Sequence, residues 1–404
     1  MPVLYVRYAT ACLAITVLAG TWMRGVLVAP AWLGPFIFQN AVHAHSHVAL
    51  FGWATMALMA LIVRAAGVVD ATSAPRWTRW FPHALGLASL AAFVGFLVRG
   101  YVLPTIVLAT LHVALWVLFA VHAWRPLALA PPVERRFWRG ALALLLVAGA
   151  GAMVPGPVRA LGVQDPWLLD LSVELFLTPF VQGWLCLGVA GLIYGRLERP
   201  RFAGAVFWLI VSGSLPAALF RSVATPPAPW LPLVGRAATV LVGVAALLLA
   251  LDMLRSSGMR RLAPLLQLGA VALVLKGAAE VGVGAGIGSA LLGNRQLVVA
   301  YLHLLLLGVV TPVLLESAVA RSPVPWLAGA QGAGLMVTLA ALAALGLPCL
   351  AGAVAAAGLT VRALLGLALA GGAVSAAAVL GVAAEGWPAW APGRVGAEGP
   401  AIRR

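Results

Sequence analysis

Apolar runs long enough to cross a membrane follow one another along almost the whole chain, and they restrict the possible folds more than any other feature. A spanning helix needs about 20 mostly apolar residues. Clusters of Arg, Pro and Gly divide the sequence into about twelve runs of this kind. They begin near Val6, His43, Trp80, Tyr101, Arg139, Asp170, Gly204, Leu231, Pro264, Gln296, Pro325 and Ala363. We therefore predict an all-α fold, a polytopic membrane helix bundle.

The charged fraction excludes a soluble globular protein. Charged residues make up 9% of the chain and apolar residues 63%, whereas soluble domains carry about 25% charged residues. The apolar runs leave no room for a separate soluble domain. We expect residues 1–392 to form one transmembrane domain and residues 393–404 to form a short basic cytoplasmic tail.

The excess of basic residues is explained by topology. The net charge of +15 would suggest nucleic acid in a soluble domain, but these residues lie between apolar runs. The loops after even-numbered runs hold more Arg than the other loops, so the positive-inside rule places both termini in the cytoplasm. We expect a multi-pass protein of a bacterial-type inner membrane, with the lipid bilayer as its partner and no nucleic acid.

Ionisable residues inside the apolar runs mark candidate functional positions, because each of them is costly in lipid. With the orientation above, most of them fall in the outer half of the bundle. The candidates are Arg24, His43, His45, His47, His112, Glu174, Lys276, Glu280 and His303. This shared depth predicts a polar or cofactor-bearing cavity near the outer surface.

Three histidines in five residues are the strongest candidates for ligands. His45 and His47 point about 200° apart on a helix, so they cannot hold one metal ion together but each can serve a different planar cofactor. His43 and His47 share a face and could chelate one ion. His303 is the candidate ligand from across the bundle. The alternative is that these imidazoles only form hydrogen bonds between helices.

Glycines follow two of the histidines at the same interval. Gly52 comes five residues after His47, and Gly308 comes five residues after His303. Because glycine has no side chain, these positions would admit either a flat macrocycle or another helix.

The remaining polar residues leave alternatives open. His112 ligates a cofactor or forms a cross-helix hydrogen bond. Lys276 and Glu280, at i, i+4, neutralise each other or form a proton or substrate site. Arg24 holds cofactor carboxylates or reaches the lipid headgroups.

The run His45-Ser46-His47-Val48-Ala49-Leu50-Phe51-Gly52-Trp53 resembles the His-x-His element of haem-copper oxidase and nitric-oxide-reductase main subunits. It is also similar to the His-x-His-x-x-Leu-Phe-Gly pattern of NnrS-type membrane proteins, bundles of about a dozen helices. The later run from Tyr301 to Pro312 occupies the place of their second His-containing helix. The resemblance implies haem b, with His45 and His47 as axial ligands of two haems and His303 as a partner.

The sequence lacks some of the histidines that bind copper in haem-copper oxidases. Oxidases bind copper with further histidines, including a neighbouring pair, and this sequence has no His-His pair. Copper is therefore the less favoured cofactor, and a complete oxygen-reducing copper site is not expected. The sequence also lacks the Cys-x-x-Cys-His element that attaches a c-type haem.

These observations favour a haem-binding, oxidoreductase-like membrane protein related to respiratory oxidases or nitric-oxide-handling proteins. Its expected partner is a respiratory electron donor or membrane complex. One alternative is a secondary transporter with a coupling site of Lys, Glu and His residues, although the two halves of the sequence show no convincing repeat. The other alternative is an assembly subunit without a cofactor.

Overall fold

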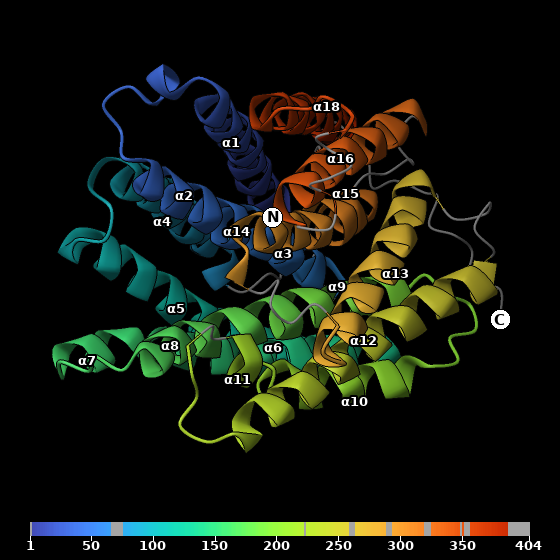
Figure 1. Cartoon of the computed structure of the whole chain (residues 1–404). Helices are drawn as coiled ribbons and strands as arrows, with labels where there is room; N and C mark the ends of the chain where they lie inside the picture. The colour runs from blue at the N-terminus through green and yellow to red at the C-terminus, as the bar shows by residue number, and fades with distance from the viewer. Residues whose placement is uncertain are drawn as a thin grey trace.

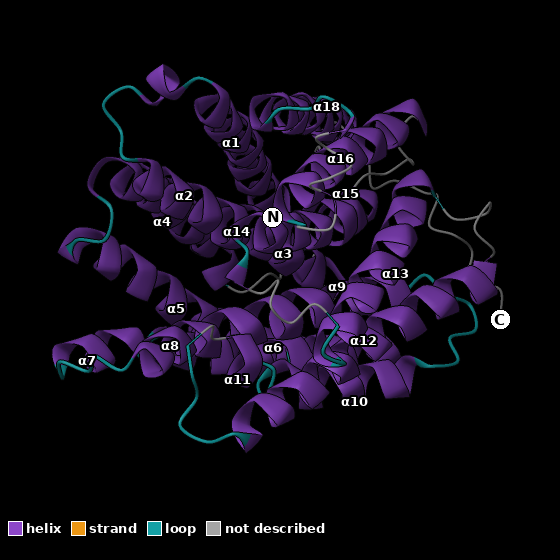
Figure 2. Ribbon diagram, in the orientation of Figure 1, coloured by secondary structure: helices purple, strands orange, loops and turns teal. Residues whose placement is uncertain are grey.

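Helices form all the regular structure of the residues described by the computed structural model, which are 2–65, 76–221, 224–257, 263–287, 293–318, 325–347, 350 and 356–386. Figure 1 shows these helices packed into one bundle, and no strand is drawn in Figure 2. The predicted all-α membrane bundle is thereby confirmed. The predicted basic tail, 393–404, lies outside the described residues.

Eleven of the helical segments are long and apolar enough to cross a membrane. In chain order the elements are α1 (Pro2–Val28), η1 (Pro30–Leu33), α2 (Phe38–His47), η2 (Val48–Thr55), α3 (Met56–Ala65), α4 (Trp77–Arg99), α5 (Leu103–Trp124), η3 (Pro126–Leu129), α6 (Pro132–Ala152), α7 (Pro155–Ala160), α8 (Pro166–Thr178), η4 (Pro179–Leu187), α9 (Gly188–Tyr194), α10 (Ala203–Ser214), α11 (Ala218–Arg221), α12 (Trp230–Ser257), α13 (Pro264–Gly284), α14 (Arg295–His303), η7 (Leu304–Val310), α15 (Thr311–Ala318), α16 (Pro325–Gly346) and α18 (Val361–Gly386). The second span begins at Phe38 rather than near His43, so its histidines lie about one turn deeper than expected.

The seventh predicted span is a broken helix. Its main part, α10, has only 12 residues, and α11 follows after a turn. Asp252 near the end of α12 accepts a hydrogen bond from the backbone N–H of Phe202 at 2.8 Å, whereas Gly235 near the start of α12 packs against Phe220. Together α10 and α11 therefore accompany α12 over about 25 Å. This length is close to the thickness of a bilayer core, as expected for the seventh span.

Both ends of the described bundle lie on one face. The last residues of α1, Leu27 and Val28, line the same cavity as Val361 and Leu365 at the start of α18. The two helices are therefore antiparallel neighbours, and α1 begins on the face where α18 ends. We call this the N-terminal face and the other the opposite face.

The bundle repeats one arrangement of four spans three times. The first span of each unit packs against the second and the third, and the third packs against the fourth. The second span of each unit contains a π-helical segment, namely η2, η4 or η7. These second, sixth and tenth spans occupy the centre, whereas the last helix of each unit contacts the first helix of the next. The repeat is threefold, so a search for two similar halves does not find it.

A glycine recurs in each π-helical segment and explains part of the repeat. An added Cβ would lie 2.7 Å from Cys12 at Gly52, 2.6 Å from Leu144 at Gly183 and 2.8 Å from Ala272 at Gly308. Each of these neighbours belongs to the first span of the same unit. Of the two roles expected for Gly52 and Gly308, the structure shows the close approach of another helix.

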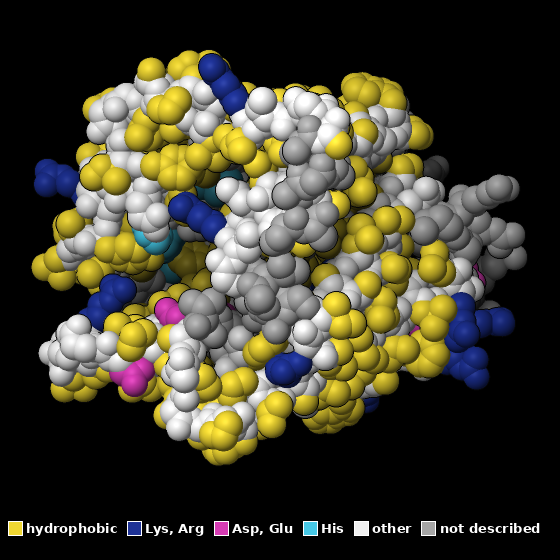
Figure 3. Space-filling model, in the orientation of Figure 1, with side chains coloured by type: hydrophobic (Ala, Val, Ile, Leu, Met, Phe, Trp, Pro, Cys, Tyr) yellow, Lys and Arg dark blue, Asp and Glu magenta, His cyan; other side chains and the backbone are white. Residues whose placement is uncertain are grey.

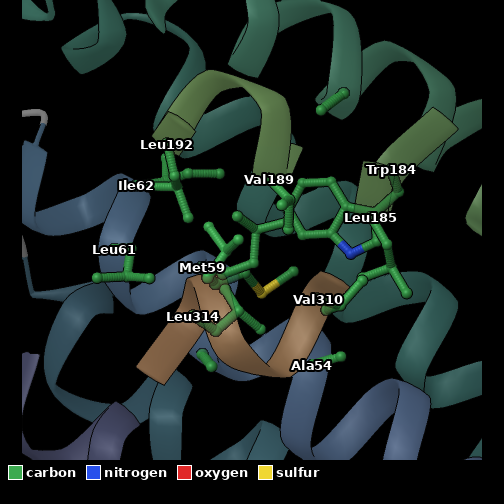
Figure 4. Packing of buried hydrophobic residues seen from close by; sticks show 14 of the residues in the cluster. Ala54, Met59, Leu61, Ile62, Trp184, Leu185, Val189, Leu192, Val310 and Leu314 are labelled. Carbon is green, nitrogen blue, oxygen red and sulfur yellow. The ribbon is translucent and has the colours of Figure 1, made fainter. Parts of the chain in front are cut away.

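The three central spans converge toward the N-terminal face. Figure 4 shows their apolar side chains interdigitating, with Met59 among Val189, Leu192 and Leu314. Two hydrogen bonds join the spans beside this core. Trp53 donates to Thr311 at 3.0 Å, and Trp184 donates to Thr55 at 3.0 Å. The polar candidates lie nearer the opposite face, in the three sectors between the central spans.

Candidate functional site

The sector between the second and sixth spans is filled with aromatic rings. Phe51 has ring contacts with Trp116 at 4.9 Å and with Phe180 at 5.6 Å between centroids. Phe176 adds a further ring at 6.0 Å from Phe51. Four aromatic rings therefore pack together between the second and sixth spans.

Three of the candidate histidines, His43, His47 and His112, lie on the side of the first unit formed by α2, α4 and α5, at the edge of this aromatic sector. His47 stacks on Phe96 with ring centroids 4.1 Å apart, and its Nδ1 bonds the carbonyl oxygen of His43 at 2.8 Å. His43 in turn makes a 3.0 Å hydrogen bond with Gln39. His47 and His43 therefore lie on the side of α2 that faces α4 and α5.

His112 is engaged by the protein at both ring nitrogens. Its side chain is 0% exposed. Nδ1 bonds the carbonyl oxygen of Leu108 at 2.7 Å, and Nε2 bonds Ser89 at 3.1 Å. Of its two expected roles, the geometry favours the cross-helix hydrogen bond.

A charged hydrogen-bond network fills the sector between the sixth and tenth spans. Lys276 and Glu280 are 2% and 3% exposed and form an ion pair of 2.6 Å. The other carboxylate oxygen, Oε1, accepts from Gln182 at 2.8 Å and from Tyr301 at 2.5 Å. Gln182 also donates to the Tyr301 hydroxyl at 2.7 Å. Lys276 and Glu280 thus neutralise each other, which favours the first of their two expected roles.

Glu174 lies on α8, about two turns before Gln182 of the same span. It is half-buried, and the Thr178 hydroxyl donates to its carboxylate at 2.7 Å.

The sector between the tenth and second spans holds His45, His303 and Arg24. The guanidinium of Arg295 lies 5.9 Å from the ring of Phe38, so α14 and α2 start side by side. His45 and His303 follow their helix starts at similar intervals, which places them within about one turn of the same depth. Arg24 is close enough to act electrostatically on both imidazoles.

Two glycines shape this sector. The ring of His45 lies against α1, where a Cβ added to Gly20 would be 3.0 Å from its Cε1 atom. Arg24 follows one turn later on the same face of α1. Its side chain covers Gly372 of α18, where an added Cβ would be 3.0 Å from the Arg24 Cδ atom. All three polar side chains are only partly buried, although they lie within spanning helices.

Arg24 and His45 have no hydrogen-bond partner within the described part of the chain. Nδ1 of His45 is buried. The Thr16 carbonyl lies close to it, but the two do not form a hydrogen bond of ordinary geometry. Arg24 likewise has no carboxylate or other acceptor among the described residues. An unpaired cation inside a membrane bundle is costly and marks a functional position.

The hydrogen bond of His303 fixes which of its nitrogens can ligate. Nδ1 bonds the carbonyl oxygen of Val299 at 2.7 Å. A carbonyl can only accept, so the proton lies on Nδ1 and the neutral ring keeps a lone pair on Nε2. Metal-ligating histidines commonly have this arrangement, because the backbone bond orients the ring.

The histidines predicted as metal ligands fall into two groups. His43 and His47 lie with His112 on the side of α2 that faces α4 and α5, whereas His45 and His303 lie with Arg24. Within the described ranges, no three His, Cys, Asp or Glu side chains are grouped closely enough to hold a metal ion. Figure 3 shows histidine side chains in a recess of the surface near α2 and α14, beside a basic side chain.

Sequence reasoning did not find several residues that build these sectors. Gln182 and Tyr301 complete the charged network, but they carry no charge that would single them out in an apolar run. Gly20 and Gly372 were missed because glycine is common throughout the chain. Only its position, two residues before His303, could have drawn attention to Tyr301 in the sequence.

Together, the fold and the buried polar sectors define a polytopic α-helical membrane protein. The sequence matches no family model and no curated protein.

Proposed function

We propose that the chain is a haem-binding integral membrane protein, related to respiratory oxidases and nitric-oxide-handling proteins, with haem b between His45 and His303. The observation that carries this proposal is Arg24, a cation without a partner among the described residues, beside two imidazoles at similar depth. Haem supplies both of the partners that these side chains lack. Its iron binds imidazole nitrogens, and its propionates are anions that can pair with Arg24.

The donor set fits this group. His303 presents a lone pair on Nε2, and the ring of His45 lies in the same sector, close to Arg24. Because the two residues belong to neighbouring central spans, they approach the sector from different helices. Arg24 would bind a propionate by charge-assisted hydrogen bonds, with Gly20 and Gly372 leaving room around it.

Bound haem would supply one-electron exchange at its iron, which suits an oxidoreductase-like protein with a respiratory electron donor or membrane complex as partner. The protein's own contribution is to hold two neutral imidazoles, pair the propionate charge and exclude water with the apolar core below. A second metal is not part of the proposal, because the described residues provide no third ligand near His45 and His303.

We further propose a bacterial inner membrane with both termini in the cytoplasm. The support is the distribution of arginines over the two faces of the bundle. Near the N-terminal face lie Arg64, Arg76, Arg79, Arg125, Arg135, Arg136, Arg139, Arg196, Arg199, Arg201 and Arg255, and near the opposite face lie Arg99, Arg159, Arg236, Arg295 and Arg362. By the positive-inside rule, the N-terminal face is cytoplasmic.

Absorption spectra of detergent-purified protein, oxidised and reduced with dithionite, test the haem proposal. Protein expressed with ample haem should show a Soret band, and His45→Ala, His303→Ala and Arg24→Ala should each lower the haem content. His83→Ala is the matched control, because His83 bonds Tyr8 near the N-terminal face and should leave the spectrum unchanged. Colourless wild-type protein would overturn the proposal.

A further inference from the structure

The helix that carries His303 is only lightly packed. No side chain of α14 is buried, although it carries a candidate ligand. Its start is fixed by Asn294, which caps the helix and donates to the Gly346 carbonyl oxygen at 2.9 Å. Apolar packing therefore constrains this end of the span less than it constrains η7, where Leu304, Leu305 and Val309 are buried.

Tyr301 provides the fixed point near the other end of this helix. Its hydroxyl donates to Glu280 at 2.5 Å and accepts from Gln182 at 2.7 Å. Tyr301 and His303 are two residues apart and so point about 200° away from each other. A bond that holds Tyr301 in the sector between the sixth and tenth spans therefore directs His303 into the sector between the tenth and second spans.

Lys276 explains why Glu280 is an effective acceptor. A lone carboxylate at this depth would be protonated or very unfavourable. The ion pair places the Lys276 ammonium 2.6 Å from the Glu280 carboxylate, and hydrogen bonds to a charged acceptor are stronger than neutral ones. The network thus joins α13, η4 and α14 through one charged group.

We infer that Tyr301, held by Glu280 and Gln182, is a positioning residue that sets the rotation of α14 and thereby aims the imidazole of His303 at its ligand. The inference rests on the proposed function for its readout at haem. It assigns Lys276 and Glu280 a role as a fixed anchor for the ligand helix.

Tyr301→Phe tests the inference, and Tyr5→Phe is its matched control. Tyr5 is also buried in a spanning helix, but its hydroxyl has no hydrogen-bond partner among the residues that the structure describes. Haem affinity should fall about tenfold or more in Tyr301→Phe, the loss expected for a hydrogen bond to a charged group. The electron paramagnetic resonance signal of the ferric protein should also shift, since it depends on how the two imidazole planes are oriented. Tyr5→Phe should change neither quantity.

The double variant Lys276→Met/Glu280→Gln removes both buried charges but keeps an acceptor for the Tyr301 hydroxyl. The amide oxygen of Gln still accepts from Tyr301 but carries no charge, so haem affinity should fall, and by less than in Tyr301→Phe. Wild-type affinity and an unchanged resonance signal in Tyr301→Phe would overturn the inference.

Hydrogen–deuterium exchange of haem-free protein keeps the two proposals distinguishable. Exchange over residues 295–303 should be faster in Tyr301→Phe than in the wild type, and unchanged in Tyr5→Phe. If the wild type binds no haem, the proposed function fails, but this measurement still decides the inference about Tyr301. Equal exchange in all three proteins would contradict it.

Discussion

The indole N–H of Trp53 donates to the hydroxyl of Thr311 across 3.0 Å, and this bond ties the second span to the tenth below His45 and His303. The bond between Trp184 and Thr55 ties the sixth span to the second in the same way. The third pair, the sixth and tenth spans, is joined by Gln182 and Tyr301. Within the described residues, each pair of central spans is therefore joined by at least one side-chain hydrogen bond.

Thr311→Val should destabilise the bundle by about 1 kcal/mol, the typical value of an interhelical hydrogen bond in a membrane. The substitution keeps the shape of the side chain but leaves the Trp53 N–H without its acceptor. Unfolding in mixed micelles by a denaturing detergent measures the change. Thr110→Val is the control, because the Thr110 hydroxyl bonds only the carbonyl oxygen of Ile106 in its own helix. Equal stability of Thr311→Val and the control would show that the bond between the spans contributes nothing.

Lys276→Met should be among the most harmful single changes, with a loss of about 3–5 kcal/mol, because it leaves Glu280 buried without its counter-charge. The double variant Lys276→Met/Glu280→Gln should recover most of the loss, since neither buried group is then charged. The same unfolding measurement distinguishes the two proteins. A double variant as unstable as Lys276→Met would mean that the ion pair itself is required.

Gly308→Ala should weaken the packing of the tenth span against α13 by about 1–3 kcal/mol, the usual cost of overpacking a core. The added Cβ would lie 2.8 Å from Ala272. Gly366→Ala on α18 is the matched control, because nothing lies within 4 Å of its added Cβ. Thermal stability of the purified variants checks the difference, and a Gly308→Ala protein as stable as Gly366→Ala would contradict the close approach.

Gly20→Val should impair haem binding more than it impairs folding. The ring of His45 already lies 3.0 Å from the position of an added Cβ, and the further methyl groups of Val would displace the imidazole. Haem content per folded protein, measured by absorbance after size-exclusion chromatography, should fall. Gly282→Val is a control in another spanning helix with open space around the glycine. A normal Soret band in Gly20→Val would argue against His45 as a ligand.

Reporter fusions should place the two ends of the chain on the same side of the membrane. Green fluorescent protein fused at either end should fluoresce, because both ends are proposed to be cytoplasmic. A fusion within the segment between α11 and α12 should be dark, since that segment connects spans at the opposite face. Fluorescence at only one end would contradict twelve crossings.

The sequence was sufficient to predict the class of fold and the positions of the spans, because helix length and apolar content are local properties. The broken seventh span was harder, since α10 is shorter than a complete crossing and only Asp252 and Gly235 of α12 show where it runs. The periodicity of His45 and His47 correctly separated their faces. Their neighbours could not be predicted, because Arg24, His303 and His112 come from helices distant in the sequence.

The threefold repeat has a consequence for how specificity arises in so uniform a chain. The same helix packing occurs three times, with a glycine at each contact, namely Gly52, Gly183 and Gly308. One short sequence pattern is therefore enough to build all three interfaces. The three interfaces differ mainly in their contents: aromatic rings in one, an ion pair in another, and two imidazoles with an unpaired guanidinium in the third. A scaffold built this way allows the contents of one interface to change while the other two keep the bundle closed.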